Sequence, residues 1–596
     1  MDDEYTTIKI PQSLVVKIDE LREKEPQYRS RADVVEVAVR CFLQKAFFEY
    51  GWPKGGKKRI LQRERNHSHN RYSKTLTVFI IATFLTLAVA AAIPVTQVSA
   101  NGPTTWNVDD DRVQCPSADY IDIQDAISVA GAGDTVNVYP GSYNPFAIIE
   151  KNELTIKSTE GAASTTVSGD YIDIDGSWYF ATIMIRDSAD VTIDGFEVVG
   201  GGWWTSSDGI WITYGGTYPD YGGSPRAAIK NNVIHHKWHG ISVSKSPDVA
   251  IENNEVYDTS GHGIYIASGS DGAVIKGNEV HDLSVSGGQG AVALFSKHCL
   301  VEGNILHDVT GWGGGMWMIN PSDCVILGND IYNNPIGIFY QGTGNRINFN
   351  NIYDNTASGS SVGNWGIYVN TGSVDAENNW WGDKSGPSGV GPGTGDAVST
   401  NVDYDPWLRA PIAEGGVKSE TVSGSGTVDA RDEADTAVVI DAVGKHTITV
   451  SKYESNPGTG FAAGKGSIGK YIDVHLDDDT GVTQIEIRLY YTDAEVAGLV
   501  ESSLKMYWWD GAAWVECSNT GVNTVLNYIW AIITATSTPN LAQLSGQGFG
   551  GGGNPAPAKP VGGEVFLVDK IALLAPYIVA ILVVATGAAV IRRRRS

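Results

Sequence analysis

Residues 229–257 read IKNNVIHHKWHGISVSKSPDVAIENNEVY, and this stretch contains two consecutive copies of one repeat. Each copy carries Asn, a variable residue, an apolar residue and then His or Tyr, as in Asn232-Val-Ile-His and Asn254-Glu-Val-Tyr. Aligned on this Asn, the chain repeats with spacings of 22, 24, 26, 25, 21 and 28 residues. A period in this range is typical of a solenoid. The remaining repeats begin at Asn278, Asn304, Asn329, Asn350 and Asn378.

Short strands and turns, with no helical period between them, fill each repeat. A Gly-Ile pair starts a second apolar run in most copies, as at Gly240 and Gly263. This pattern predicts coils of short parallel strands. Asn suits the turn position because it tolerates the left-handed backbone conformation, and its amide can bond the next Asn along the axis. An upstream helical face (Ile123, Ala126, Ile127 and Ala130) is expected to cap the open end of the stack. The residues three before each Asn should form an inward column: Ile229, Ile251, Ile275, Val301, Ile326 and Ile347.

The repeats, together with NNWWGDKSGP at 378–387 and VDYDPWL at 402–408, resemble a known fold. The resemblance is to the right-handed parallel β-helix of the pectin-lyase-like superfamily, in its subgroup of carbohydrate-binding and sugar-hydrolase domains and NosD-like proteins. It covers residues 104–408. This fold hosts lyases, hydrolases, epimerases and pure binders, so the residues of a site must decide the function.

A polar column is predicted at the residue before the repeat glycine, where Asp208, His239 and His262 should stack about 4.8 Å apart. SDGIWI and SGHGIYIASGS are similar to two polygalacturonase motifs, but Trp238-His239-Gly240 stands where that family needs an Asp pair. Hydrolysis by two carboxylates is therefore poorly supported. The three residues are candidate catalytic residues and a candidate metal site. The alternative is a row of exposed polar residues before tight turns, and no other cofactor is predicted.

A second column should face outward as an aromatic ladder: His235, Tyr257, His281, His307, Tyr332 and Tyr353. Such a ladder either rigidifies the coils or offers rings to a sugar. Large aromatic residues in Gly-rich loops also favour polysaccharide binding. The candidate glycan-binding residues are Trp203, Trp204, Trp211, Trp238, His281, His307, Trp312 and Trp317.

The C-terminal half changes pattern. Residues 417–545 alternate as strands without the repeat, which predicts an antiparallel β-sandwich stalk with a hairpin at Asp510-Gly511. Residues 546–565 are rich in Gly and Pro and are expected to be a flexible linker.

Two apolar segments, 75–93 and 571–591, carry no charge and are long enough to cross a bilayer. Basic residues at 51–74 and 592–596 place both ends in the cytoplasm of a prokaryotic cell, with residues 101–565 outside the plasma membrane. A signal sequence cleaved after Ala100 is the alternative for the first segment. The outer part is acidic: residues 101–568 carry 56 acidic and 22 basic side chains.

Residues 1–50 contain TIKIP at 7–11 and YRSRADVV at 28–35, which resemble the ribbon-helix-helix DNA-binding family of the Arc/MetJ type. The resemblance implies a homodimer whose strands enter the major groove. Thr7 and Lys9 would then face bases, with Tyr5 at the edge, and Ser30 and Arg31 would hold a phosphate. A dimerisation module that binds no DNA is the alternative.

These observations predict a mainly β, membrane-anchored surface protein. Its β-helix would bind polysaccharide, and its cytoplasmic domain would bind DNA as a transcription regulator does. The rival hypothesis is a surface enzyme, a polysaccharide hydrolase or lyase, and the sequence favours the binding protein. Cys299 and Cys324 each lie five residues before a repeat Asn and are expected to be buried free thiols on neighbouring coils.

Overall fold

The computed structural model describes residues 102–557, apart from 175, 201–206, 215–222, 357–362 and 545. The predicted ribbon-helix-helix domain, the basic segment 51–74, both apolar segments, and Trp203 and Trp204 lie outside the described residues. Within the described part, no helix is long and apolar enough to cross a membrane.

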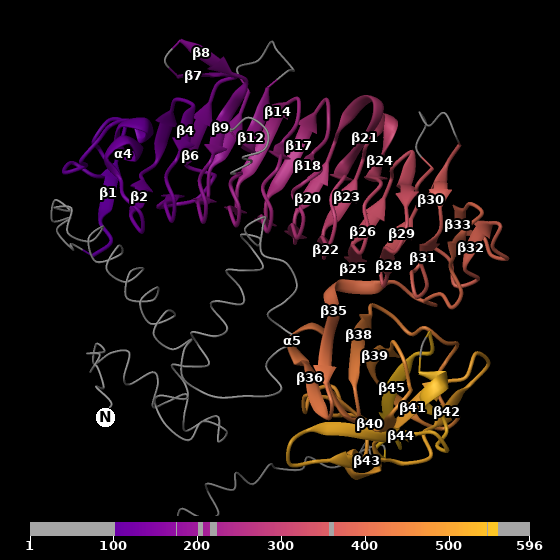
Figure 1. The fold of residues 1–596 in the computed structure, drawn as a ribbon. Coiled ribbons are helices and arrows are strands. Elements are labelled where there is room, and N and C mark those ends of the chain that lie inside the picture. Colours follow the sequence, from indigo (N-terminus) through magenta and orange to yellow (C-terminus); the bar gives the residue numbers. More distant parts are fainter. Residues whose placement is uncertain are drawn as a thin grey trace, which may run out of the picture. The chain divides into compact units, whose positions relative to one another are not determined.

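Three parallel sheets form the walls of a β-helix, as the repeat predicts (Figure 1). The central coils give one strand to each sheet, and neighbouring coils pair in register, so that Ile229 faces Ile251 and Ile251 faces Ile275. The 12-stranded sheet contains β1 (Thr105–Val108), β2 (Thr135–Val138), β5 (Thr155–Ser158), β10 (Thr192–Asp194), β13 (Ala228–Lys230), β16 (Ala250–Glu252), β19 (Val274–Lys276), β22 (Leu300–Glu302), β25 (Val325–Leu327), β28 (Arg346–Asn348), β31 (Val374–Asp375) and β34 (Val402–Asp403). The 9-stranded sheet contains β3 (Gly141–Tyr143), β6 (Thr165–Ser168), β11 (Glu197–Val199), β14 (Val233–Lys237), β17 (Glu255–Thr259), β20 (Glu279–His281), β23 (Ile305–His307), β26 (Asp330–Tyr332) and β29 (Asn351–Tyr353). The 11-stranded sheet contains β4 (Phe146–Ile149), β9 (Ala181–Arg186), β12 (Asp208–Thr213), β15 (Ile241–Val243), β18 (Ile264–Ile266), β21 (Ser284–Leu294), β24 (Thr310–Ile319), β27 (Ile336–Gly342), β30 (Trp365–Gly372), β32 (Pro387–Gly389) and β33 (Gly395–Val398).

The predicted inward column is confirmed, because all six of its residues are fully buried in one continuous core. The Asn ladder is confirmed too: Asn278 Nδ2 donates to Asn304 Oδ1 at 2.9 Å, and Asn304 Nδ2 donates to Asn329 Oδ1 at 2.9 Å. Its last member is Asn379 and not Asn378, since Asn350 bonds Asn379 Oδ1.

The prediction that the ladder Asn itself takes the left-handed conformation is wrong. The residue before it does so, with φ of +53° at Asn231, +64° at Gly277 and +55° at Asn378. Placing the left-handed residue one position earlier turns each ladder amide into the core, where it can reach the next coil.

The repeat glycines permit close packing between coils. A Cβ on Gly240 would lie 2.6 Å from the carbonyl oxygen of Gly263 and 2.3 Å from a methyl of Val256. The upstream cap is the helix α4 (Ile123–Val129), whose Ile123, Ala126 and Ile127 are buried against the first coil, as predicted.

One coil is interrupted by an antiparallel hairpin, β7 (Ile172–Ile174) and β8 (Ser177–Tyr179). It lies between β6 and β9, and it stands out from the stack of coils in Figure 1. The sequence pattern does not predict it.

The C-terminal part consists of two antiparallel sheets around a second core that includes Ile440, Val474, Ile487 and Phe549. One sheet contains β35 (Ile412–Ser423), β38 (Lys445–Tyr453), β39 (Gly466–Leu476), β45 (Phe549–Gly553), β41 (Lys505–Trp509) and β42 (Trp514–Glu516). The other contains β36 (Gly426–Ala430), β37 (Thr436–Ala442), β40 (Val482–Tyr490), β44 (Tyr528–Thr534) and β43 (Thr520–Asn523). Three single turns of helix lie between these strands: α5 (Arg431–Ala434), η1 (Glu501–Ser503) and η2 (Leu541–Gln543).

The predicted start of the flexible linker at 546 is wrong. Phe549–Gly553 forms β45, which pairs with β39 and β41 inside the sheet. The glycines are there for packing: a Cβ on Gly552 would lie 2.3 Å from the ring of Phe461, and one on Gly550 would lie 2.9 Å from the ring of Tyr471. The hairpin at Asp510-Gly511 forms between β41 and β42, but its loop spans 510–513.

Candidate functional site

The predicted aromatic ladder forms on the outer face of the 9-stranded sheet. Its rings lie nearly parallel, and successive centroids are 4.7, 5.3, 5.1, 4.8 and 5.1 Å apart from His235 to Tyr353. Stacking at this spacing follows from the in-register pairing of the strands. The ladder therefore stabilises the coils against one another.

Carboxylates occupy both nitrogens of the ladder histidines His281 and His307. In His307, Nδ1 lies 2.7 Å from Asp308 and Nε2 lies 3.3 Å from Glu279. In His281, the corresponding distances are 2.8 Å to Asp282 and 3.5 Å to Glu255. The ring faces of these two predicted glycan-binding residues are stacked and their nitrogens are engaged. They lie on a different sheet from Trp211, Trp312 and Trp317, which belong to β12 and β24.

The polar column of Asp208, His239 and His262 lies along the N-terminal ends of β12, β15 and β18 in the 11-stranded sheet. The rings of His239 and His262 stack with centroids 5.1 Å apart, and Tyr265 stacks on His262 at 5.0 Å. The structure thus brings the three predicted residues to neighbouring coils. The column stops at the next coil, because the residue in register with His262 there is Gly290, which has no side chain.

The hydrogen bonds of the two histidines do not fit a metal site. Nδ1 of His239 accepts the backbone N–H of His262, and Nδ1 of His262 accepts the backbone N–H of Gly290. A neutral imidazole whose Nδ1 is an acceptor carries its proton on Nε2. Neither nitrogen then offers a free lone pair to a cation, so the candidate metal site is not supported by the donor set.

Asp208 has the electrostatics of a functional carboxyl group. Burial raises its pKa to about 7, and this shift outweighs the opposing effects of a Ser242 hydrogen bond and of the nearby Lys237 charge. Its backbone N–H donates to the carbonyl of Phe180 at 3.1 Å. A carboxyl group that titrates near neutrality beside aromatic rings is a candidate for acid or base chemistry.

Lys237, which sequence reasoning missed, lies near Asp208 and interacts with it electrostatically. Its side chain is fully buried, and burial lowers its pKa to about 8. Nζ donates to the carbonyl of Gly169 at 2.7 Å and to the hydroxyl of Thr182, and it lies 3.5 Å from a carboxylate oxygen of Asp170. Lys237 thereby joins the start of the β7–β8 hairpin to the coil of the polar column.

Aromatic residues recur along the outer face of the 11-stranded sheet. In-register pairing places Trp211, Tyr265, Trp317, Phe339 and Tyr368 at equivalent outward positions of β12, β18, β24, β27 and β30. We call this set the aromatic column. Ser242 and Ala293 fill the same position on β15 and β21.

The predicted tryptophans differ in their access to solvent. Trp238 and Trp211 are half-buried, and Trp312 is 40% exposed. Trp317 is buried, stacked on Phe339 at 4.0 Å and flanked edge-on by Trp312. Trp317 therefore supports the column, while the other three can touch a ligand.

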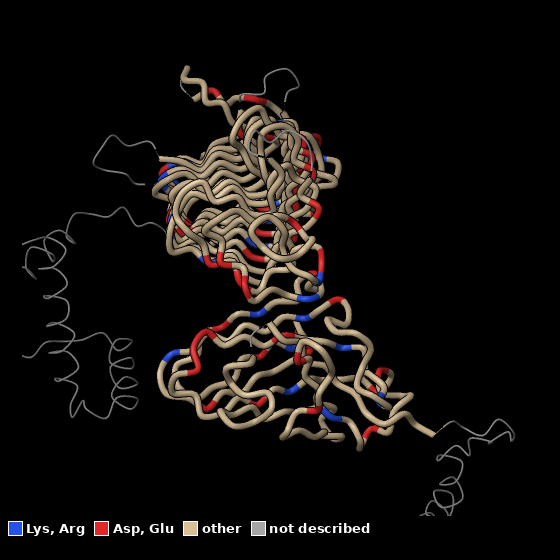
Figure 2. The backbone as a smooth tube through the Cα atoms, turned by 90° about the vertical axis from the view of Figure 1, so that its right-hand side faces the viewer, with Lys and Arg blue, Asp and Glu red and all other residues tan. Residues whose placement is uncertain are grey.

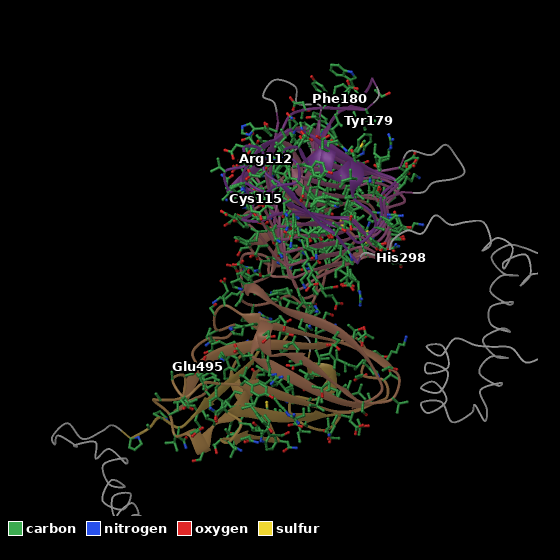
Figure 3. The ribbon with its side chains drawn as sticks, turned by 90° about the vertical axis from the view of Figure 1, so that its left-hand side faces the viewer. Arg112, Cys115, Tyr179, Phe180, His298 and Glu495 are labelled. Carbon is green, nitrogen blue, oxygen red and sulfur yellow. The ribbon has the colours of Figure 1, made fainter. Side chains whose placement is uncertain are left out.

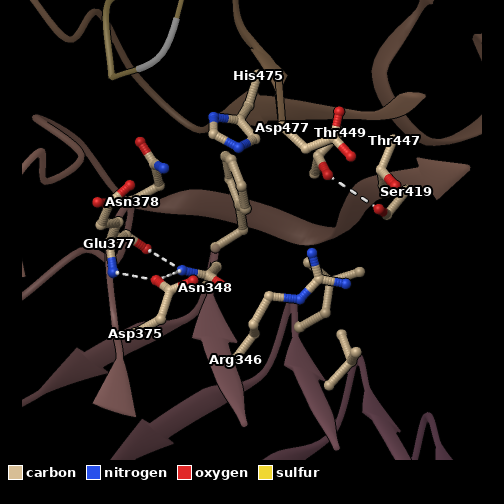
Figure 4. A pocket seen from close by; sticks show the side chains of 13 residues that line it. Arg346, Asn348, Asp375, Glu377, Asn378, Ser419, Thr447, Thr449, His475 and Asp477 are labelled. Carbon is tan, nitrogen blue, oxygen red and sulfur yellow. Dashed lines mark hydrogen bonds between the residues drawn. The ribbon is translucent and has the colours of Figure 1, made fainter. Parts of the chain in front are cut away.

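A separate cavity of about 190 Å³ opens between β28, β31 and the strands β35, β38 and β39 (Figure 4). Asn348 donates to Asp375 at 2.7 Å and to the carbonyl of Glu377 at 3.0 Å there. Burial, followed by Asp375 and two further acidic groups, raises the pKa of Glu377 to about 7. The cavity contains none of the predicted site residues.

Residues 161–287 and 220–381 match the family model described as a right-handed β-helix region. No curated protein matches the chain. Among solved structures, the Dettilon tailspike protein gp208 is similar at 10% identity, covering 72% of this chain and 89% of its own, with a TM-score of 0.28. The A-module of the mannuronan C-5 epimerase AlgE4 of Azotobacter vinelandii is similar at 16% identity, covering 46% of this chain and 95% of its own, with a TM-score of 0.30. Pectate lyase Pel9A is similar at 12% identity, covering 51% of this chain and 79% of its own, with a TM-score of 0.31.

Likenesses of this degree say nothing about a substrate or a reaction. The three parallel sheets and the family match over 161–381 together show that this chain contains a right-handed parallel β-helix.

Proposed function

We propose that the β-helix binds an extended polysaccharide along its 11-stranded sheet. The half-buried members of the aromatic column, Trp211, Tyr265 and Tyr368, carry this proposal, because they lie in one line over the strands from β12 to β30. The buried Trp317 and Phe339 support them from within the same line. Six strand spacings of about 4.8 Å make this line roughly 29 Å long, which suits a polymer and not a small molecule. Aromatic faces pack well against the C–H faces of sugar rings, and Trp238 and Trp312 lie where such a chain would run.

Charge indicates which polymers this surface accepts. Acidic side chains predominate over Lys and Arg along the coils (Figure 2), and residues 101–568 carry 56 acidic against 22 basic side chains. A polyanion is repelled by such a surface. The favoured ligand is therefore a neutral polysaccharide, and nucleic acid binding by the β-helix is disfavoured.

Modification of the polysaccharide is the second candidate function, and Asp208 favours it. A carboxyl group with a pKa near 7 can give or take a proton at neutral pH. The histidines beside it are neutral Nε2–H donors that can hydrogen-bond a sugar hydroxyl. Hydrolysis by the common two-carboxylate route would need a partner carboxylate within about 10 Å, and the predicted column supplies none.

Display outside a prokaryotic plasma membrane, homodimerisation and DNA binding by residues 1–50 remain proposals from the sequence. The segments that would perform these roles lie outside the described residues.

The test is native gel electrophoresis of the full-length protein in gels that contain xylan, dextran or alginate. We expect a neutral polymer to retard the protein and Trp238→Ala to weaken the retardation about tenfold in apparent Kd. Leu526→Ala, at an exposed residue of the C-terminal part, is the control and should change nothing. Mobility unchanged in every polymer would overturn the proposal.

The second candidate is tested on the retained polymer. Release of reducing ends or unsaturated products that is lost in Asp208→Asn, with retardation intact, would support modification. Retention without any product over days would leave binding as the function.

A further inference from the structure

The β7–β8 hairpin presents three aromatic side chains to solvent. Tyr171, Trp178 and Phe180 are 47%, 58% and 57% exposed. The rings of Tyr171 and Trp178 lie 4.4 Å apart at 16° to each other, so their planes are almost parallel. Among the described residues, one other large aromatic side chain is exposed, Trp312, and it is less so at 40%. Exposed rings gathered on one protruding hairpin indicate a binding surface.

The opposite side of the hairpin anchors it firmly. Ile172 packs against Ala181 and Met184 of β9, and the half-buried Tyr179 joins the same cluster. The hydroxyl of Tyr179 accepts a hydrogen bond from Arg186 at 2.8 Å. A two-stranded hairpin is marginally stable alone, so these contacts are what hold the rings in place.

The hairpin directly adjoins the polar column of Asp208, His239 and His262. The carbonyl of Phe180 accepts the N–H of Asp208, so the two residues lie on adjacent coils about 4.8 Å apart. Asp170, at the base of the hairpin, accepts a hydrogen bond from Ser207 at 3.1 Å. Trp211 packs on the same apolar cluster as the inner side of the hairpin. A chain that crosses Asp208 therefore reaches the hairpin within one or two sugar units. Tyr179 and Phe180 lie at the outer edge of the β-helix in Figure 3.

The chemistry of the hairpin favours a sugar ring as its occupant. Its exposed apolar groups are flat rings, while the aliphatic Ile172 and Ile174 point inward, unlike the mixed surface of a protein contact. Asp173 is exposed beside the rings and offers carboxylate oxygens to hydroxyl groups. The same carboxylate opposes insertion into a membrane. The acidic surroundings favour a neutral sugar over a uronate.

We propose that Tyr171, Trp178 and Phe180 form a platform for a pyranose ring of a neutral polysaccharide, at the end of the path that passes Asp208. This inference rests on the proposed function and adds to it a site that the aromatic column does not include. Trp178 supplies the largest open face, and Tyr171 fixes its orientation by stacking.

The experiment uses full-length protein with xylan, dextran and alginate in affinity gels. Trp178→Ala is expected to weaken retention by a neutral polymer about tenfold in apparent Kd, and Tyr171→Ala by a smaller factor. Leu526→Ala is the matched control, since Leu526 is 62% exposed and lies far along the chain. In the wild-type protein, hydroxyl-radical footprinting should show Trp178 protected by the neutral polymer, which needs no variant.

The outcomes separate this platform from the proposed function. Retention that is equal in wild type and Trp178→Ala, with Trp178 unprotected, overturns the platform and leaves polysaccharide binding standing. No retention in any polymer overturns both. Stronger Trp178-dependent retention by alginate overturns the neutral class of sugar. Self-association that Trp178→Ala abolishes, measured by sedimentation without polymer, assigns the rings to a contact between copies and overturns the sugar platform.

Discussion

The Nδ1 atom of His239 accepts the backbone N–H of His262 at 2.8 Å, and the two imidazole rings stack with centroids 5.1 Å apart. This contact joins two coils through a side chain that also faces the candidate site. It holds the His239 ring neutral, because protonation of Nδ1 would place two donors against each other, and the N–H of Gly290 does the same for the His262 ring. The geometry therefore links the protonation of the site to the stability of the coils.

Stability is expected to fall as the pH drops from about 6.5 towards 4. Burial lowers the pKa of His239 to about 4, and burial followed by the neighbouring His239 lowers that of His262 to about 3. Between those values and about 6.5 the unfolded chain binds protons that the folded chain does not, so stability rises with pH in this window and is flat above it. His262→Gln should flatten the dependence of Tm on pH, while the exposed His298→Gln should not. Equal slopes in wild type and His262→Gln would contradict the assignment.

Replacing Lys237 by Met should destabilise the β-helix by roughly 3–5 kcal/mol. The substitution removes a buried cation and leaves the carbonyl of Gly169 and the carboxylate of Asp170 without its contacts. Chemical denaturation measures the loss. Lys230→Met, which breaks only the half-exposed pair with Glu252 at 2.9 Å, should cost less than about 1 kcal/mol. If Lys237→Met is as stable as Lys230→Met, the buried amine does not stabilise the fold.

Removing one rung of the Asn ladder should cost about 2–5 kcal/mol. Asn304 is fully buried, and its amide serves the N–H of Asn278, the carbonyl of Ile275 and the amide of Asn329. Asn304→Ala leaves these groups unpaired in the core. The exposed Asn370→Ala should stay within about 0.5 kcal/mol. Urea unfolding midpoints compare the two, and a similar small change in both would refute the role of the ladder.

Asp473 should make the C-terminal part less stable as pH rises. The side chain is fully buried, and burial raises its pKa from 3.8 to about 8 despite a hydrogen bond from the Tyr453 hydroxyl. Between these pH values the unfolded chain loses a proton that the folded chain keeps, so stability falls with rising pH up to about 8 and is flat above it. Asp473→Asn should raise Tm more at pH 8 than at pH 4, and the exposed Asp479→Asn should not. An equal gain at both pH values would show that Asp473 is ionised in the fold.

Thiol labelling should distinguish the four described cysteines. Cys299, Cys324 and Cys517 are buried, while Cys115 is half-buried. The native protein should react with maleimide at Cys115 first, and at the other three only after denaturation without a reductant. Peptide mass spectrometry identifies the modified sites. Rapid labelling of Cys299 or Cys324 in the native state would show that the coils open there.

Local repetition explains why so much of the β-helix was predictable. Residues one period apart in the sequence are neighbours in space. The spacing of Asn278, Asn304 and Asn329 therefore predicts which of their side chains contact one another. The inward column and the ladder from His235 to Tyr353 follow from the same rule, whereas the cap formed by α4 was predicted from its own apolar helical face. The polar column of Asp208, His239 and His262 could be located this way, although its hydrogen bonds could not.

Features that depend on distant partners were decided by the tertiary structure. His236 takes a φ of +57°, as Asp258 and Asp282 do at the equivalent turns, but the buried amine of Lys237 after it meets Gly169 and Asp170, which lie 68 and 67 residues earlier in the chain. The glycine run 549–553 resembles a linker in sequence and becomes a strand because bulky rings of other strands need the space beside it. The β7–β8 hairpin belongs to no repeat, so its place beside Asp208 follows only from the folded coil. The sequence by itself thus determined the coils and their register, because those contacts recur at one period. Only the tertiary structure determined the buried charge, the neutral histidines and the aromatic platform, because their partners lie at no fixed separation along the chain.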